Sequence, residues 1–166
     1  MPTITITTIV NATPELCFDL SRSIDLHTIS TKQTGERAVA GATSGVINLN
    51  ETVTWKAKHF GIWQHLTSKI TEYSRPAYFV DEMVKGTFAR FRHEHHFKKQ
   101  NNQTIVIDIF DYTSPLGILG SAADKLFLKT YMYKLLLERN RVIKEYAETD
   151  KWQEIIPAIV QNQLKL

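Results

Sequence analysis

Residues 104–117 read TIVIDIFDYTSPLG, and they separate two periodicities in the chain. Residues 104–112 are rich in β-branched and aromatic residues, which predicts a strand. Beyond the turn at 114–117, apolar residues recur at the three- and four-residue spacings of a helix: Leu128, Tyr131, Met132, Leu135, Val142, Ile143 and Tyr146. We therefore expect one helix from about Gly120 to about Ala147, roughly 40 Å long at about 1.5 Å per residue.

Upstream of this change, apolar and polar residues alternate in short segments with turns between them. The pattern predicts strands over residues 51–60, 62–73, 78–84, 88–98 and 104–112. The connections are short, which favours antiparallel pairing of neighbours. Before these strands, Gly35, Gly41 and Gly45 are expected to break the chain into turns.

The N-terminal segment predicts one more strand and two short helices. Thr3–Val10 alternates isoleucine with threonine, as a strand does. Thr13 before Pro14 indicates a helix start, because the hydroxyl caps the first turn and proline has no N–H to satisfy there. A second short helix is expected near residues 25–29. The order strand, two short helices, strands, long helix predicts an α+β domain, with the long helix on one face of an antiparallel sheet.

The composition is that of an ordinary globular protein. The 166 residues suggest one domain, 43% of them are apolar, and the net charge is +3. No apolar run approaches the roughly 18 residues of a membrane helix, and the N-terminus does not resemble a signal peptide. The longest basic neighbourhood, Lys98-Lys99, is too short to predict a nucleic-acid partner. Cys17 stands alone and is expected to be a small buried residue, so we expect a cytoplasmic protein with no integral membrane segment.

Three stretches of the sequence resemble a known superfamily. They are residues 52–61 (TVTWKAKHFG), residues 79–95 with Phe79-Val80-Asp81-Glu82 and Phe91-Arg92-His93-Glu94-His95, and residues 114–140 with Ser114-Pro115-Leu116-Gly117, Tyr131-Met132 and Glu138-Arg139-Asn140. Over about residues 3–147 the chain resembles the SRPBCC superfamily, whose START-like, polyketide cyclase-like and Bet v 1-like members share the helix-grip fold. Within it, the chain is similar to a bacterial subgroup that is sometimes labelled cell-division-related.

The resemblance implies a strongly curved sheet that grips the long helix, with a cavity between them. Such cavities commonly hold sterols, lipids, quinones or polyketides, and a minority of members catalyse cyclisation, dehydration or hydrolysis. Residues 1–147 would form this domain, and residues 148–166 a C-terminal extension that we expect to be helical. The fold alone does not choose between binding and catalysis.

The first candidate site lies on the strand predicted over residues 88–98. Phe91, His93, His95 and Phe97 share one face, and the apolar outer pair predicts that this face is the concave one. The two imidazoles would then stand about 7 Å apart. They could bind a polar ligand group or transfer protons, and the alternative is a pair of internally satisfied histidines. A metal site is not expected, because the sequence shows no third ligand at a recognisable spacing.

Two charged residues interrupt apolar patterns. Arg139 falls within the apolar stripe of the long helix, where an unpaired charge would be costly. Its partner would be a carboxylate of the strands, namely Asp81, Glu82 or Asp108, or else an anionic ligand group. Asp108 interrupts a strand that is apolar on both faces, so it needs a local partner as well. Acid–base catalysis by Asp108 with His93 is a further alternative.

Several large apolar residues are predicted to line the cavity: Trp55, Phe79, Met83, Phe91, Phe110, Tyr112, Tyr131 and Met132. For each of them, plain core packing is the alternative. The sequence carries no nucleophile elbow, phosphate loop or metal motif, so no cofactor is expected. The leading hypothesis is the binding of a small apolar or amphipathic molecule. The alternatives are a cyclase, dehydratase or hydrolase that uses His93 and His95, or a protein-interaction module.

The C-terminal tail predicts one more apolar surface. Pro157 suits the first turn of a helix, and aliphatic residues surround it: Ile155, Ile156, Ile159, Val160 and Leu164. The long helix carries a second apolar row that points away from the sheet-facing stripe, made of Leu126, Tyr133 and Leu137. We expect these two surfaces to cover each other, either within one chain or in a homodimer.

Overall fold

The computed structural model describes residues 2–114 and 127–156 of the chain. Its strands are β1 (Thr3–Val10), β2 (Arg37–Gly41), β3 (Thr52–His59), β4 (Ile62–Ser74), β5 (Tyr78–Lys85), β6 (Arg90–Gln100) and β7 (Gln103–Thr113). Its helices are α1 (Pro14–Ser21), α2 (Ile24–Ser30), the short 3-10 helix η1 (Lys32–Thr34), α4 (Lys129–Ala147) and α5 (Trp152–Ile155).

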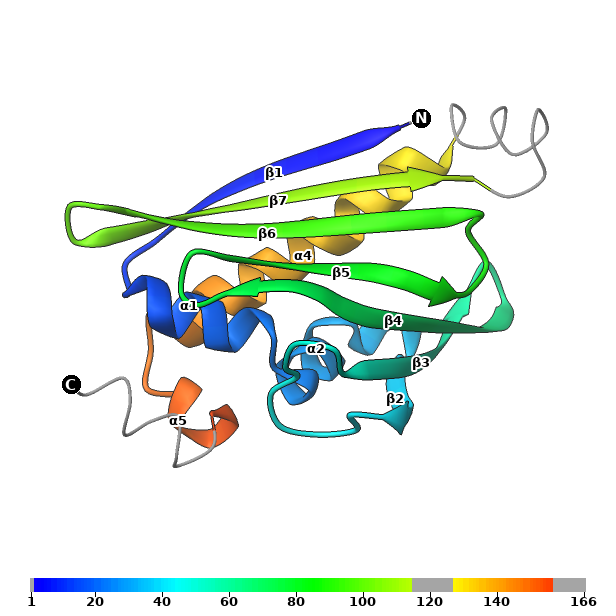
Figure 1. Ribbon diagram of the computed structural model, residues 1–166, viewed down its shortest axis with the longest axis horizontal. Coiled ribbons are helices and arrows are strands. Elements are labelled where there is room, and N and C mark those ends of the chain that lie inside the picture. The colour runs from blue at the N-terminus through cyan, green and yellow to red at the C-terminus, as the bar shows by residue number, and fades with distance from the viewer. Residues whose placement is uncertain (1, 115–126, 157–166) are drawn as a thin grey trace.

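The strands form one antiparallel sheet in the order β1-β7-β6-β5-β4-β3-β2. Neighbouring strands follow one another in the sequence except where β1 pairs with β7. Figure 1 shows α4 crossing one face of this sheet obliquely, with α1 and α2 beside its C-terminal half. The α+β helix-grip arrangement that the sequence predicted is therefore confirmed.

Local signals position the first two helices. Thr13 has an extended backbone and accepts a hydrogen bond from the Leu16 N–H, so it caps α1, whose first residue is Pro14. Ser23 caps α2 in the same way, through the Leu26 N–H. The two caps therefore fix the residues at which α1 and α2 begin.

Strand β2 is an element that the sequence analysis missed. The sequence predicted only turns around Gly35, Gly41 and Gly45, whereas Arg37–Gly41 pairs with β3 at the edge of the sheet, with a bulge between Ala38 and Ala40. The strand is largely exposed, so its sequence carries no alternating apolar pattern. It ends at Gly41, whose φ is +75° and where a side chain would collide with the Thr52 carbonyl oxygen.

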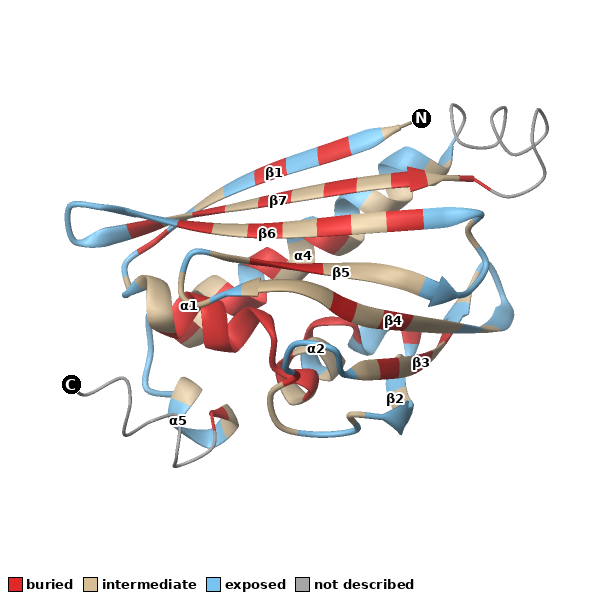
Figure 2. Ribbon diagram, in the orientation of Figure 1, coloured by how far each residue is buried: buried red, intermediate tan, exposed pale blue. Residues whose placement is uncertain are grey.

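Two clusters of buried side chains lie between the sheet and the helices. Figure 2 colours the buried residues red along the strands and on α1. The larger cluster joins α1, α2 and the C-terminal half of α4 to the sheet, and it includes Phe18 and Trp55. The smaller cluster includes Phe91, Phe110 and residues of β1 and α4. Cys17 is fully buried, as predicted. Residues of both clusters line the candidate site.

Parts of the long helix and of the tail fall outside the described residues. These are residues 120–126, expected as the first turns of the long helix, and residues 157–166 of the tail. The start of the extension forms α5, and Ile156 after it is buried in the larger cluster. Tyr133 and Leu137 of the second apolar row are exposed. Among the described helices, none combines the length and the apolar character that a membrane crossing requires.

Candidate functional site

A cavity of about 420 Å³ lies between the sheet and α4. Its walls come from α1, α2, strands β3 to β7 and α4. Most of the residues predicted to line a cavity do line it: Trp55, Phe79, Phe91, His93, Phe110, Tyr131, Met132 and Arg139. Met83, His95 and Asp108 do not form part of its wall.

These three residues lie beside or behind the wall. His95 and Asp108 are almost fully buried, and each contacts a side chain that lines the cavity. Met83 packs against the smaller buried cluster. Tyr112 is fully buried in that cluster, so for Tyr112 the core-packing alternative is correct.

The inner face of β6 carries four buried side chains, as its alternation predicts: Phe91, His93, His95 and Phe97. The predicted separation of the two imidazoles is wrong, however. The ring centroids of His93 and His95 are 3.9 Å apart instead of about 7 Å. The rings approach each other because both turn toward the same two carboxylates.

These carboxylates are Asp81 on β5 and Asp108 on β7. The antiparallel register places Asp81 opposite His93 and Asp108 opposite His95. His95 bridges them, with Nδ1 2.6 Å from Asp108 Oδ1 and Nε2 3.1 Å from Asp81 Oδ1. His93 Nε2 lies 3.2 Å from Asp108 Oδ1 but out of line for a hydrogen bond, and its Nδ1 lies 3.7 Å from Asp81 Oδ1. We call these four side chains the Asp–His cluster.

Burial and charge oppose each other within the Asp–His cluster. Burial alone would raise the pKa of both carboxyl groups, but the histidines lower these pKa values, that of Asp108 well below its usual range. Burial also opposes the charged form of His95, yet its contacts with Asp108 and Asp81 outweigh this and raise its pKa. Burial and the charge of His95 lower the pKa of His93 to about 4. Near neutral pH the cluster therefore holds two carboxylates and a neutral His93.

Helix α4 adds a cation and an amide to the cluster. Arg139 donates to the Ser21 carbonyl oxygen through Nη2, and its Nη1 lies 4.0 Å from Asp108 Oδ1. Asn140 Nδ2 donates to Asp108 Oδ2 at 2.6 Å. Arg139 thus faces a strand carboxylate and lines the cavity at the same time. The charge of Arg139 therefore offsets part of the charge of the two carboxylates.

Several polar members of this site are not predicted from the sequence. Asp81 was expected only as a partner for Arg139, and Asn140 was not expected at the site. Both lie in stretches that carry the family resemblance, but only strand register and helix packing bring them together. The buried hydroxyls of Ser21 and Ser114 also belong to side chains of the cavity wall, and within the described part of the chain they have no hydrogen-bond partner.

The cavity reaches solvent between the β3–β4 turn and the start of α4. Phe60 and Phe127 both line the cavity, although they are 57% and 48% exposed. Their ring centroids lie 5.5 Å apart, and the Phe60 ring also contacts that of Tyr131. The Tyr131 hydroxyl is 2.8 Å from His59 Nδ1. The rim of the opening is therefore mainly aromatic.

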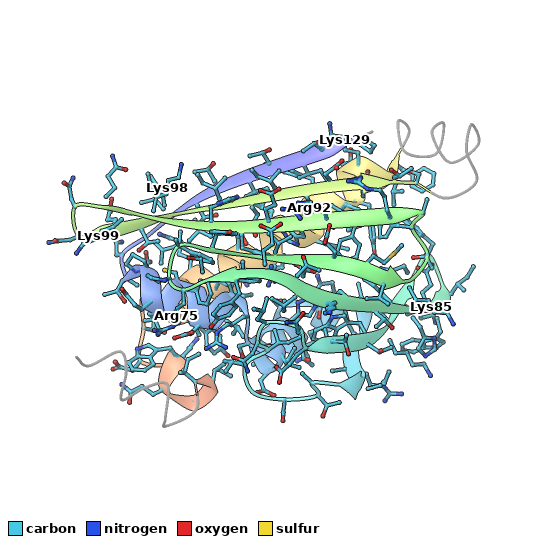
Figure 3. The ribbon with its side chains drawn as sticks, in the orientation of Figure 1. Arg75, Lys85, Arg92, Lys98, Lys99 and Lys129 are labelled. Carbon is cyan, nitrogen blue, oxygen red and sulfur yellow. The ribbon has the colours of Figure 1, made fainter. Side chains whose placement is uncertain are left out.

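The outer face of the same strands carries a second group of charges. Arg92, labelled in Figure 3 near the middle of the sheet, contacts Glu72 at 2.8 Å, Glu94 at 3.0 Å and Glu82 at 3.4 Å. His96 Nε2 lies 2.9 Å from Glu94 Oε2. Each of these side chains is partly exposed. We call them the outer network.

Solved structures share this architecture, whereas no protein-family model and no curated protein matches the sequence. TTHA0849 from Thermus thermophilus has a TM-score of 0.71 at 16% identity, covering 87% of this chain and 95% of that one. Major latex-like protein 151 from Panax ginseng has a TM-score of 0.65 at 14% identity, covering 89% and 98%. Ara h 8.0201 has a TM-score of 0.59 at 10% identity, covering 88% and 97%.

At these identities the likeness is one of fold. The ginseng protein and Ara h 8.0201 are Bet v 1-like proteins. None of the structures named here bears on cell division, so the label attached to the bacterial subgroup gains no support. The seven-stranded antiparallel sheet, the short helices after its first strand and the long C-terminal helix match this fold. The chain therefore has the Bet v 1-like helix-grip fold.

Proposed function

We propose that the protein binds a small amphipathic molecule in the cavity between the sheet and α4. The cavity itself carries this proposal. Its volume of about 420 Å³ falls within the range of roughly 300–1,000 Å³ that is typical of small-molecule sites. Protein interiors are otherwise packed with few voids larger than a water molecule, so a space of this size favours a ligand over plain core packing.

The distribution of polar groups supports an amphipathic ligand over a purely apolar one. Aromatic and aliphatic side chains make up most of the wall, including Trp55 and Phe79. Asp81, His93 and Arg139 interrupt it on the side of β5, β6 and α4. The apolar part of such a ligand would pack against the aromatic and aliphatic wall. Its polar end would lie beside Asp81, His93 and Arg139, since a buried polar group without a hydrogen-bond partner costs free energy.

Displacement of an apolar fluorescent probe tests the proposal. Anilinonaphthalene sulfonate should bind the EDTA-treated protein, and a long-chain quinone or fatty acid should displace it. Ala57 lines the cavity, so Ala57→Leu should fill part of it and weaken probe binding about tenfold, or about 1.4 kcal/mol. The neighbouring Lys58 is exposed, so Lys58→Leu adds the same side chain outside the cavity.

The two variants separate cavity binding from surface binding of the probe. Equal probe affinities for the wild type and Ala57→Leu, with unchanged thermal stability, would contradict the proposal. A stronger effect of Lys58→Leu than of Ala57→Leu would place the probe on the outer surface of the sheet and would contradict it as well.

A further inference from the structure

Two histidines and a carboxylate converge at the wall of the cavity. Asp81, His93 and His95 come from the adjacent strands β5 and β6, and each offers one ligand atom within 4.8 Å of the others. Asp81 and His93 both line the cavity, whereas His95 lies behind them. The grouping cannot be predicted from local sequence spacing, because the carboxylate lies on a different strand from the histidines.

Both imidazoles are oriented in the same way. Each directs one nitrogen toward Asp81 Oδ1, at 3.1 Å for His95 Nε2 and 3.7 Å for His93 Nδ1. Each directs its other nitrogen toward Asp108 Oδ1, at 2.6 Å for His95 and 3.2 Å for His93. Histidines that bind metals show this arrangement, with one nitrogen on the ion and the other facing a carboxylate that sets the tautomer.

The contacts of His93 are incomplete without a further cation. A neutral imidazole has one N–H, so it can donate to only one of the two carboxylates that face it. Its other nitrogen then directs a lone pair at a carboxylate oxygen, which is repulsive. The buried Nε2 has no hydrogen-bond partner among the described residues, which shows that the pairing with Asp108 is imperfect. A cation between Asp81 and the two histidines would turn this repulsion into coordination.

We propose that Asp81 Oδ1, His93 Nδ1 and His95 Nε2 bind a divalent transition-metal ion at the cavity wall. The ion would displace to solvent the proton through which His95 Nε2 is hydrogen-bonded to Asp81. Zinc–nitrogen and zinc–oxygen bonds of about 2.0–2.2 Å place tetrahedral ligands about 3.4 Å apart, and the present contacts of 3.1 and 3.7 Å bracket this value. Two imidazoles and one carboxylate suit zinc or ferrous iron. Asp108, held by Asn140, would be the shared acceptor behind both imidazoles.

The site would leave coordination positions open toward the cavity. Three protein ligands are the pattern of sites that keep a position for water or substrate, whereas structural zinc sites use four. A polar ligand group in the cavity could occupy that position. The metal proposal does not depend on ligand binding, since it rests only on the convergence of these three side chains.

Cobalt provides the test, because Co²⁺ replaces Zn²⁺ in such sites and absorbs visible light. Untagged, EDTA-treated protein should bind one Co²⁺ per chain with visible absorption bands, and Zn²⁺ should remove them. Asp81→Asn and His93→Ala should each weaken Co²⁺ binding at least about tenfold. Loss of a residue that merely supports a metal ligand already weakens binding by about that factor, and these two residues are proposed as ligands themselves. His96→Ala is the matched control, because His96 lies on the outer face of the same strand and contacts Glu94.

A measurement on the wild type alone covers the case in which a variant fails to fold. Among the six histidines, the imidazole NMR signals of His93 and His95 should show the largest paramagnetic shifts with Co²⁺. Absence of Co²⁺ binding to the wild type would overturn the proposal. So would binding that survives in folded Asp81→Asn or that is lost in His96→Ala. Probe binding to the metal-free protein is unaffected by any of these outcomes, so the two proposals fail separately.

Discussion

The two faces of the central strands carry similar side chains in opposite surroundings. On the inner face, the ion pair of His95 with Asp108 is 2.6 Å long, and both side chains are at most 3% exposed. On the outer face, the ion pair of Arg92 with Glu72 is 2.8 Å long, but these side chains are 29% and 43% exposed. The contact lengths are nearly the same, so the difference between the faces lies in solvation.

The difference in solvation sets how much each contact contributes to stability. Water replaces a lost partner on the outer face, and an exposed ion pair contributes about 0–1 kcal/mol. On the inner face nothing replaces it, and breaking a buried pair leaves an uncompensated charge that costs about 3–5 kcal/mol. Single polar substitutions should therefore lower the free energy of unfolding most in the Asp–His cluster.

Loss of Asp108 should give the largest effect. Asp108→Ala removes the acceptor of His95 and Asn140 and the nearest carboxylate to Arg139, so the free energy of unfolding should fall by about 3–5 kcal/mol in urea titrations. Asp111→Ala is the matched control, since Asp111 lies on the outer face of the same strand and pairs with exposed Arg90. It should cost about 1 kcal/mol or less. Equal losses of unfolding free energy in the two variants would show that burial does not set how much these ion pairs contribute.

Cys17 extends the comparison to a buried thiol. Burial raises the pKa of the Cys17 thiol to about 12, so at pH 8 only about one thiol in ten thousand is ionised. Iodoacetamide should therefore modify the native protein at least about a thousandfold more slowly than the protein in guanidinium chloride, as mass spectrometry would show. Below the pKa, the thiolate fraction of the native protein rises about tenfold per pH unit. Similar native and unfolded rates would show that Cys17 is accessible.

Truncation of Arg92 should give the smallest effect. Although Arg92 contacts three carboxylates, Arg92→Ala should lower the free energy of unfolding by about 1 kcal/mol or less, because its side chain and its partners are hydrated. Added salt should reduce this difference further. A loss as large as that of Asp108→Ala would mean that the outer network acts cooperatively and that exposure alone does not set its contribution.

The fold could be predicted almost completely from the sequence. The alternation of β6 and β7, the Thr13 cap and the apolar stripe of α4 are patterns among residues close together in the chain. Strand β2 escaped prediction because an exposed edge strand needs no apolar alternation. The buried face of β6 could be predicted because apolar and polar residues alternate along that strand.

The candidate site could be predicted only in part. Aromatic wall residues and both histidines followed from alternation, but Asp81 and the partners of Asp108 did not. A signal for Asp108 existed in the β6–β7 hairpin, because His95 and Asp108 are equally distant from its turn and symmetric pairing places them opposite each other. The β5–β6 hairpin carries no such signal for Asp81, because Asp81 and His93 lie at different distances from the turn between their strands.

Apart from β2, the strands and the helices α1, α2 and α4 can be predicted from the sequence, and so can the buried faces of β6 and α4, because these properties depend on neighbours a few residues away. The turn of His93 and His95 toward shared carboxylates, and the contact of Asn140 on α4 with Asp108, arise only in the tertiary structure. Such contacts depend on rotamers and register between distant segments. The cavity is likewise the space left where the whole sheet packs against α4, so no local sequence pattern predicts its volume.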